Sequence, residues 1–369
     1  MEKDITFSDV LIEPQLSSVK SRSDVSLTSD FSKFAIDLPV FSSNMPDVTE
    51  YKMAITMWEN GGMGILHRFM SIEENVTQYK AACDEIYRAA LPLNRKVLAG
   101  YECGVSIGIQ DEERERFEVL YAAGARLFCI DIAHGHSEGM RRMIEWIRSH
   151  ETMNDVYIIA GNVATGQGAI DLASWGANAI KVGIGPGRVC TTRSRTGIGV
   201  SQFTAIDRVY EALESMGCFG EHLETGGIII RPMRIIADGG IRTSGDVGKA
   251  LIRSHGVMLG GVFAGTLETP GPVFTEPGTD LIDRRYFKYY GGSASAENKI
   301  ANGNGCKPKF VEGERIKVPL KGHAKYLMDE IREGVQSTFS YSNAKTLEEY
   351  HSRVKWNGIS SGAKEESKI

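Results

Sequence analysis

The chain of 369 residues has few cysteines, no long apolar run and no strong excess of either charge, and each absence excludes a class of protein. Its six cysteines lie far apart, so no two have the close spacing of a zinc-binding motif. No segment reaches the ~20 uninterrupted apolar residues of a membrane span, and no basic stretch leads into an apolar run near the first residue. The 42 lysines and arginines, against 47 acidic residues, include no basic block typical of nucleic-acid binding. We therefore expect a cytoplasmic protein that binds neither a membrane nor a nucleic acid.

What is present is the composition of an ordinary globular chain, with 42% hydrophobic and 24% charged residues. Between positions 39 and 261 short apolar runs recur, and most are followed by a helix-like stretch. Eight of these runs are candidate strands, at 39–44, 64–67, 96–101, 127–132, 156–162, 179–185, 234–239 and 257–260. Strands that are apolar along nearly their whole length indicate a parallel sheet covered by helices. Eight such units predict an α/β fold of the (β/α)8 (TIM) barrel type, and an open doubly wound sheet is the alternative.

Chemically active side chains stand at or just beyond the carboxyl ends of these runs, which is where barrel enzymes build their active sites. They are Asn44, His67, Glu102, Asp131, Asn162, Cys190 and Asp238. Any one of them has an alternative interpretation as an ordinary strand-ending turn residue. Seven together favour the barrel and predict an active site at its carboxyl face.

We expect a single barrel domain over residues 1–356. Two segments interrupt its repeating pattern, at 202–231 and at about 286–314. The second is rich in glycine, serine, asparagine and lysine, and this composition predicts a mobile flap over the active face. The tail at 357–369 has almost nothing to bury, so we expect it to be disordered.

The segment at 181–193 directly follows an apolar run and combines glycines, a cysteine and two arginines. Glycines let the backbone turn sharply and present its amides or carbonyls to a ligand. Arg188 and Arg193 flank Cys190, and a nearby positive charge favours the thiolate form, which makes Cys190 a candidate nucleophile. Two alternatives are a dinucleotide-binding fingerprint, which normally belongs to an early βαβ unit, and a buried structural cysteine in a tight turn.

The stretch at 182–193 resembles the cysteine loop of the IMP dehydrogenase/GMP reductase family. Further similar segments occur in order along nearly the whole chain, at 6–11, 21–25, 43–45, 131–137, 160–165, 237–241, 257–261, 290–293 and 318–322. The resemblance implies a β/α barrel, typically within a homotetramer, that binds a purine nucleotide and a nicotinamide cofactor. It implies an NAD(P)-dependent oxidoreductase of purine metabolism.

Within that family the chain resembles the GMP reductases more than the IMP dehydrogenases. Residues 102–126 pass between adjacent strands without the regulatory CBS modules that dehydrogenases usually carry, and 304–313 lacks the Arg-Tyr pair that activates water in them. The Glu-Gly pair at 312–313 and Ser-Thr-Phe-Ser-Tyr at 337–341 are similar to reductase motifs. In contrast, 64–68 and 131–137 resemble the dehydrogenase branch. The reductase resemblance makes NADPH the expected cofactor, and the dehydrogenase-like segments make NADH the alternative.

The resemblance implies a covalent mechanism in which Cys190 attacks the purine carbon that bears the amino group of GMP. Ammonia leaves, a hydride from the nicotinamide reaches the same carbon, and IMP is released from the sulfur. Thr192 and Glu312 are implied as the relay that gives the departing amine its proton once the flap closes. Glu312 has an alternative interpretation as a solvated charge of the flap.

The resemblance also implies a set of nucleotide-binding residues. Asp238 accepts hydrogen bonds from the ribose, Gly240, Gly260 and Gly261 offer backbone amides to the phosphate, and Tyr289 adds a phosphate contact. The remaining members of this set are Arg188, Gly292, Ser293, Lys309 and Gly313. Serine is usual in the family at the position of Arg188, and methionine at that of Gly292. A modified purine nucleotide is therefore an alternative substrate.

The cofactor residues that the resemblance implies fall into two groups. Those at the nicotinamide end are Arg68, Asp131, Ile132, Ala133, Ile184 and Gly185. Those at the adenosine end, which a neighbouring subunit shares, are Ser21, Arg22, Ser337, Thr338, Phe339 and Ser340. A potassium ion is implied at Gly185, Gly187, Cys190 and Arg193. The same motifs also fit an IMP dehydrogenase without CBS modules, or a nucleotide-binding regulator without turnover.

Overall fold

The computed structural model describes residues 4–150, 154–219, 223–225, 228–230, 232–276, 285–292, 295 and 311–366. Eight of its strands are parallel and close into a barrel in the order β12-β13-β4-β5-β6-β7-β8-β9. They are β4 (Val40–Ser42), β5 (Met63–Leu66), β6 (Gly104–Ile107), β7 (Leu127–Asp131), β8 (Tyr157–Val163), β9 (Ala179–Val182), β12 (Arg234–Asp238) and β13 (Gly256–Leu259). The ring closes where β13 pairs with β4, with Val257 opposite Val40. The predicted (β/α)8 barrel is confirmed.

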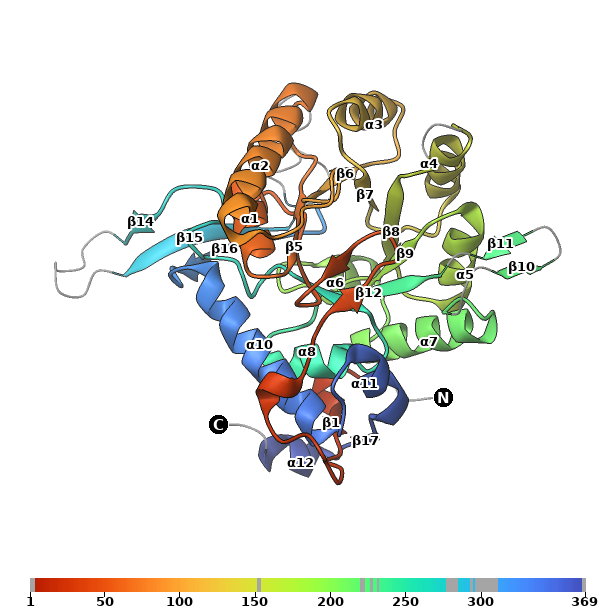
Figure 1. Ribbon diagram of the computed structural model, residues 1–369, viewed down its shortest axis with the longest axis vertical. Helices are drawn as coiled ribbons and strands as arrows, with labels where there is room; N and C mark the ends of the chain where they lie inside the picture. Colours follow the sequence, from red (N-terminus) through yellow and green to blue (C-terminus); the bar gives the residue numbers. More distant parts are fainter. Residues whose placement is uncertain are drawn as a thin grey trace.

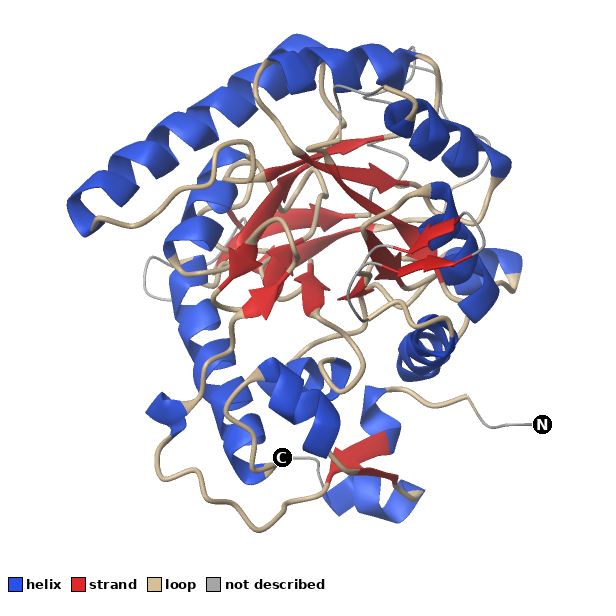
Figure 2. Ribbon diagram, turned by 45° about the vertical axis from the view of Figure 1, so that its right-hand side comes forward, coloured by secondary structure: helices blue, strands red, loops and turns tan. Residues whose placement is uncertain are grey.

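Helices surround the barrel strands, as the blue and red elements of Figure 2 show. They are α1 (Tyr51–Glu59), α2 (Ile72–Leu93), α3 (Glu112–Ala122), α4 (Glu138–Arg148), α5 (Gly166–Trp175), α7 (Gln202–Ser215), α8 (Ser244–Ala250) and α10 (Ala324–Tyr341). Several begin with a side-chain cap: Ser71, Ser137, Thr165 and Thr243 each accept a hydrogen bond from a backbone amide three residues further along. Because the first amides of a helix have no partner within it, these caps fix where each helix begins.

The amino-terminal end of the barrel is filled with aromatic side chains. A short hairpin of β2 (Ser29–Asp30) and β3 (Ala35–Ile36) carries Phe31 and Phe34, whose rings stack with their centroids 5.1 Å apart. Both rings make edge-to-face contacts with Tyr157, the first residue of β8. This end is packed like a protein core, so the carboxyl end is the one that remains for a ligand.

One barrel strand lies elsewhere than the sequence predicts. Residues 96–101 form a loop and a turn, and β6 is found eight residues further along, at Gly104–Ile107. The prediction was wrong because Gly104 and Ser106 interrupt the apolar pattern of the true strand. The site is tightly packed, since a Cβ on Gly104 would lie 3.1 Å from the Ile65 side chain.

The segment at 202–231 contains α7 and then an antiparallel pair, β10 (Leu223–Thr225) and β11 (Ile228–Ile230). This pair lies outside the barrel in Figure 1, and β9 pairs directly with β12. The insertion therefore leaves the eight-strand ring intact. Among the described residues, no helix has both the length and the apolar character needed to cross a membrane.

The expected flap at 286–314 begins on a strand. In a three-stranded antiparallel sheet, β15 (Tyr286–Gly291) pairs with β14 (Phe274–Thr275) on one side and with β16 (Arg315–Pro319) on the other. This sheet forms the base of the flap. Residues 296–310, which make up most of the predicted flap, lie outside the described residues.

The tail that the sequence predicts to be disordered contains regular structure. β17 (Trp356–Gly358) pairs with β1 (Val10–Ile12), and α12 (Ser361–Glu366) follows. Lys364 in this helix forms an ion pair with Asp9. The structure differs from the expectation because the partners of the tail lie near the other end of the chain, which local composition does not reveal. The last three residues lie outside the described part.

Candidate active site

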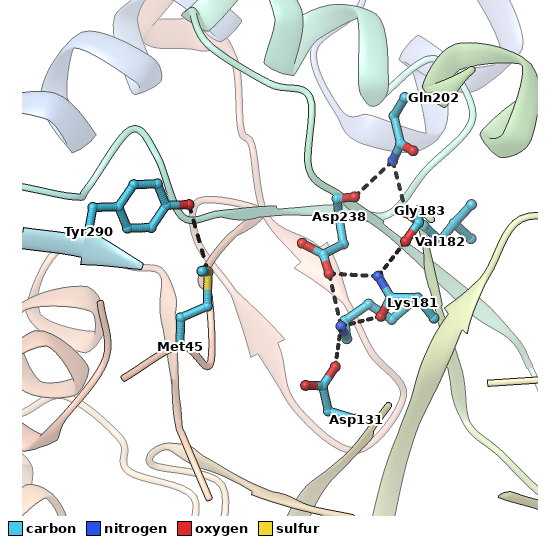
Figure 3. Close-up of polar contacts among 9 residues, drawn as sticks. Met45, Asp131, Lys181, Val182, Gly183, Gln202, Asp238 and Tyr290 are labelled. Carbon is cyan, nitrogen blue, oxygen red and sulfur yellow. Dashed lines mark hydrogen bonds and ion pairs between the residues drawn. The ribbon is translucent and has the colours of Figure 1, made fainter. Parts of the chain in front are cut away.

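At the carboxyl end of the barrel a polar layer replaces the aromatic filling of the other end (Figure 3). Asp131 ends β7, Asn162 lies in β8 and Asp238 ends β12, and all three accept hydrogen bonds from the Nζ of Lys181 in β9. Nζ lies 2.7 Å from Asp131 Oδ1 and 2.8 Å from Asp238 Oδ2. The sequence predicted the three acceptors at this face but missed Lys181. The signal in the sequence that identifies Lys181 is a single charged residue inside an otherwise apolar strand.

The polar layer also holds the start of the loop that follows β9. Asn162 Nδ2 donates to the carbonyl oxygen of Gly183 at 2.7 Å and to Asp238 Oδ2 at 2.9 Å. The buried Gln202, the first residue of α7, donates through Nε2 to the carbonyls of Val182 at 2.8 Å and Asp238 at 3.1 Å. Sequence reasoning missed Gln202 as well. These bonds fix where the loop leaves the barrel.

The charges of the layer stabilise one another. Burial by itself raises the pKa of Asp131, but the adjacent Lys181 ammonium outweighs it, so the pKa of Asp131 is lowered. Burial lowers the pKa of Lys181, but the carboxylates of Asp131 and Asp238 outweigh it and raise this pKa above its ordinary value. At neutral pH the lysine is therefore protonated and Asp131 is ionised.

The other polar residues predicted at this face do not all reach it. Asn44 and His67 follow β4 and β5 and are buried there, and the His67 Nε2 lies 3.6 Å from Glu50 Oε1. Glu102 instead precedes β6, so it lies at the opposite, amino-terminal end of the barrel. The expectation for Glu102 was wrong because the third strand was placed too early.

The loop after β9 starts with a glycine that no other residue can replace without a shift of the backbone. Gly183 has φ of +147°, and a Cβ on it would lie 2.1 Å from the carbonyl oxygen of Asp238. Further along, Cys190 forms an isolated β-bridge with Gly313, and the amide of Glu314 donates to the carbonyl of Val189 at 2.9 Å. The base of the flap therefore holds the cysteine loop.

The three residues predicted to be catalytic are in contact. Cys190 Sγ lies 3.2 Å from Thr192 Oγ1, and this hydroxyl donates to Glu312 Oε2 at 2.8 Å. The Thr191 amide also donates to the Glu312 carbonyl at 2.9 Å, which fixes the backbone beside the carboxylate. A thiol, a hydroxyl and a carboxylate thus form a hydrogen-bonded series at the barrel mouth.

The two arginines that flank Cys190 in the sequence differ in their surroundings. Arg193 donates through Nε to the carbonyl of Ile184 at 3.2 Å and through Nη2 to that of Val200. The exposed Arg188 passes beside Gly261, where a Cβ would lie 3.7 Å from the arginine side chain. The guanidinium of Arg193 therefore binds backbone carbonyls and not the Cys190 thiol, although the two residues are close in the sequence.

A family model described as IMP dehydrogenase / GMP reductase domain matches residues 4–369. The chain belongs to this family. It is 34% identical to inosine-5'-monophosphate dehydrogenase of Borreliella burgdorferi, over 98% of this chain and 96% of the relative. It is 33% identical to GMP reductase of Streptococcus suis, over 92% of this chain and 91% of the relative. A crystal structure of a GMP reductase variant from Trypanosoma brucei, in complex with guanosine 5'-monophosphate, is similar with a TM-score of 0.86 and 25% identity, covering 100% of this chain and 98% of that one.

Most glycines that the family resemblance assigns to the nucleotide lie against the cysteine loop. They are Gly240, Gly261, Gly292 and Gly313. A Cβ on Gly292 would lie 3.3 Å from the Val189 carbonyl oxygen, so the flap base approaches the loop closely. Two further residues of the set, Ser293 and Lys309, lie outside the described residues.

Of two neighbouring tyrosines, the structure turns the second toward the barrel. Tyr289 is 41% exposed, and the Arg315 guanidinium lies 4.6 Å from its ring. Tyr290 is buried, with its hydroxyl oxygen 3.7 Å from the sulfur of Met45, and a Cβ on Gly260 would lie 2.8 Å from that oxygen (Figure 3). Successive residues of a strand point to opposite faces, so only one of the pair faces the barrel. Sequence reasoning named Tyr289 and missed Tyr290.

A second cation lies near Arg188. Lys321 Nζ donates to the carbonyls of Gly261 at 2.9 Å and Val262 at 2.8 Å. Burial, and then the positive charge of Arg188, lowers the pKa of Lys321. The strand end at Gly261 is therefore flanked by two basic side chains, and this is a suitable place for an anion.

The two segments expected at the adenosine end of the cofactor meet in the structure. Arg22 Nη1 donates to Ser337 Oγ at 3.0 Å, and Ser21 caps the short helix that contains Arg22. Phe339 does not join them, because it is fully buried and its ring stacks on Tyr350 at 4.1 Å. This position of α10 faces the core, whereas Ser337 lies on the side that faces Arg22, so the cofactor role of Phe339 stays a prediction that only its backbone can fulfil.

At the positions expected to bind the nicotinamide, Asp131, Ile132 and Ala133 lead from the polar layer to the surface, where Ala133 is exposed. Arg68, just after β5, has its guanidinium 3.7 Å from the Glu113 carboxylate. The other expected cofactor residues, Ile184, Gly185, Thr338 and Ser340, are partly exposed. These positions are accessible to a ligand.

The family resemblance implies a potassium ion on carbonyls of the cysteine loop, and two of these carbonyls each accept one backbone hydrogen bond in the structure. The Gly187 carbonyl accepts the Cys190 amide at 3.1 Å, and the Arg193 carbonyl accepts the Gly197 amide at 3.0 Å. A carbonyl oxygen has two lone pairs, so each of these oxygens keeps one for a cation. Rings of backbone carbonyls are the usual protein ligands of this ion.

Proposed function

We propose that this chain catalyses the NADPH-dependent reductive deamination of GMP to IMP and ammonia through a covalent adduct on Cys190. The observation that carries the proposal is the hydrogen-bonded series of Cys190, Thr192 and Glu312. A thiol beside a proton relay is what the reaction needs, because sulfur must add to a purine carbon and an amino group must leave with an extra proton.

The reaction divides into two steps at one carbon. The Cys190 sulfur bonds to the carbon that carries the amino group, the carbon–nitrogen bond breaks, and ammonia leaves. A thioimidate then joins the purine to Cys190. Bound NADPH supplies a hydride to the same carbon. The carbon–sulfur bond breaks, the thiolate is restored and IMP is released.

The hydrogen bonds of the site define the path of the proton. Thr192 donates to Glu312, so its oxygen is free to accept the thiol proton of Cys190. A shift of both protons by one position leaves a thiolate on Cys190 and a protonated Glu312. Once the sulfur has bonded to the purine carbon, Thr192 gives its hydroxyl proton to the departing amine and takes a proton back from Glu312.

The nucleotide is bound by groups on either side of the cysteine loop. Asp238 uses Oδ2 for Lys181 and Asn162, which leaves Oδ1 for the ribose hydroxyls. The positive charges of Arg188 and Lys321 and the adjacent backbone amides bind the phosphate by charge-assisted hydrogen bonds. This arrangement supports a purine nucleoside monophosphate as the substrate.

The residues present fit a nicotinamide cofactor. Asp131 and Ala133 orient the nicotinamide end beside the polar layer, and Arg22 binds the other end. Arg22 donates to the neutral hydroxyl of Ser337, so its charge remains available for the 2'-phosphate that distinguishes NADPH from NADH. We expect a neighbouring subunit of a homotetramer to cover this end, and a potassium ion on the carbonyls of the cysteine loop.

Two assays with the purified protein test the proposal. We expect GMP to oxidise NADPH in a stoichiometric reaction that forms IMP and ammonia. The loss of NADPH absorbance measures this reaction. We also expect mass spectrometry of the protein mixed with GMP to find a nucleotide adduct on Cys190. Cys190→Ala should bind GMP with wild-type affinity and have no turnover.

Each alternative function corresponds to a different result. Formation of NADH from IMP without GMP reduction would show an IMP dehydrogenase. Turnover of a modified purine nucleotide but not GMP would show that Arg188 and Gly292 have changed the substrate. Nucleotide binding without any turnover would show a regulator.

A further inference from the structure

We propose that Lys181 is a positioning residue shared by the two ligand sites, because its ammonium orients Asp238 toward the nucleotide and Asp131 toward the cofactor. The inference rests on the proposed function, which assigns these two carboxylates to two different ligands. Both ligands then bind to carboxylates that are held by the same buried charge.

All three N–H donors of the Lys181 ammonium have acceptors within the barrel. These acceptors are Asp131, Asn162 and Asp238, which come from β7, β8 and β12. The Lys181 side chain is 3% exposed, whereas each of the two carboxylate side chains is 18% exposed. The lysine is therefore out of reach of a ligand, while the carboxylates that it holds are accessible.

The geometry gives each carboxylate two different sides. One oxygen of Asp131 and one of Asp238 face Lys181, and these bonds fix the rotation of the carboxylate planes. The other oxygen of each carboxylate then has a defined direction. Asn162, held by the same ammonium, donates to the Gly183 carbonyl, so the start of the cysteine loop depends on Lys181 as well.

Without this ammonium, two carboxylates would face one buried point. Like charges at close range cannot both remain ionised at low cost, so the pair would take up a proton near neutral pH. A protonated carboxyl rotates freely and accepts weaker hydrogen bonds. We therefore expect the loss of Lys181 to make ligand binding depend on pH, which a lysine with only a packing role would not do.

The test is calorimetric titration with GMP and, separately, with NADPH, so that the readout does not require turnover. In Lys181→Met we expect both affinities to fall about tenfold or more near pH 6.5 and to recover in part toward pH 8.5. The wild type should show little change over this range. Lys181→Arg, which keeps the charge, should restore most of the affinity for both ligands.

A matched control is Lys249→Met. Lys249 is a partly buried lysine on α8 whose Nζ donates to the carbonyl of Phe7 at 2.9 Å. We expect this variant to bind both ligands as the wild type does, at every pH. The comparison separates the loss of this particular charge from the general effect of a lost lysine.

The inference would be overturned if folded Lys181→Met bound both ligands like the wild type, or if only one of the two affinities changed. If Lys181→Met does not fold, Lys181→Met with Asp131→Asn removes the unpaired charge together with the lysine. In that double variant Asp238 lacks the ammonium that orients it, so GMP binding should be weaker than in the wild type. The binding should no longer depend on pH, and a persistent pH dependence would contradict the proposal. A wild type that binds neither GMP nor NADPH would instead defeat the proposed function.

Discussion

The hydroxyl of Thr192 joins two groups that are distant in the chain, the thiol of Cys190 and the carboxylate of Glu312. Its contribution is specific, because valine has nearly the same shape but can neither donate nor accept a proton. Replacement of this side chain by valine therefore interrupts the proposed proton path without a change in packing.

Thr192→Val should lower kcat about 100-fold to 1,000-fold, since the departing amine loses its proton donor. The dissociation constant for GMP should not change, because the hydroxyl does not bind the nucleotide. Steady-state kinetics and calorimetry measure the two quantities. Ser194→Ala is the control, since this exposed hydroxyl of the same short helix bonds only to the Thr191 carbonyl among the described contacts. Equal kcat values in Thr192→Val and Ser194→Ala would exclude the relay.

At the scale of elements, the junction between β9 and the cysteine loop has the tightest backbone approach in the site. Gly183 lies between the carbonyl of Asp238 and the side chain of Gln202, so the ends of two strands and a helix meet at one residue. A side chain there would separate the polar layer from the loop that carries Cys190.

Gly183→Ala should therefore destabilise the fold by about 3 kcal/mol or more, because a positive φ and a clash with backbone add together. Gly197→Ala is the matched control. Gly197 also has a positive φ, +74°, but a Cβ on it would meet nothing within 4 Å, so we expect a cost of about 1 kcal/mol. Urea denaturation measures both free energies of unfolding. An equal loss of unfolding free energy in the two variants would contradict the prediction, because it would show that the backbone moves to remove the clash with Asp238.

At the scale of the whole molecule, stability should decrease as the pH falls below neutrality. His255 and His351 lie with their ring centroids 5.3 Å apart, and burial lowers the pKa of both. In the unfolded chain these rings have a pKa of about 6.5, so below this pH the unfolded state binds protons that the folded state does not. The stabilising contribution is therefore present above pH 6.5 and is lost as the pH falls.

The free energy of unfolding should accordingly be lower at about pH 5.5 than at about pH 7.5. Replacement of both rings, by His255→Asn with His351→Asn, should reduce this difference, whereas His134→Asn at an exposed position should leave it as in the wild type. Carboxylates with lowered values, such as Asp9 with a pKa of about 2, contribute only in more acidic solution. A wild type of constant stability across this range would contradict the prediction.

The sequence by itself determined the architecture and the family, and it predicts which groups react. Local periodicity predicts strands and helices because it records which side of an element is buried, and seven of the eight barrel strands were located in this way. It failed at β6, where the interior needs glycine and serine and the apolar pattern is lost. Cys190, Thr192 and Glu312 were found by their resemblance to a family motif.

Only the tertiary structure decided which of these groups meet. Thr192 and Glu312 are 120 positions apart, and the contacts of Lys181 join three other strands of the barrel. The same holds for Phe339, which faces the core. The direction of a side chain depends on how distant elements pack against it, and this information is absent from the local sequence. Composition and spacing therefore specify which segments form strands and helices. The closing of the barrel specifies which side chains at the strand ends come into contact.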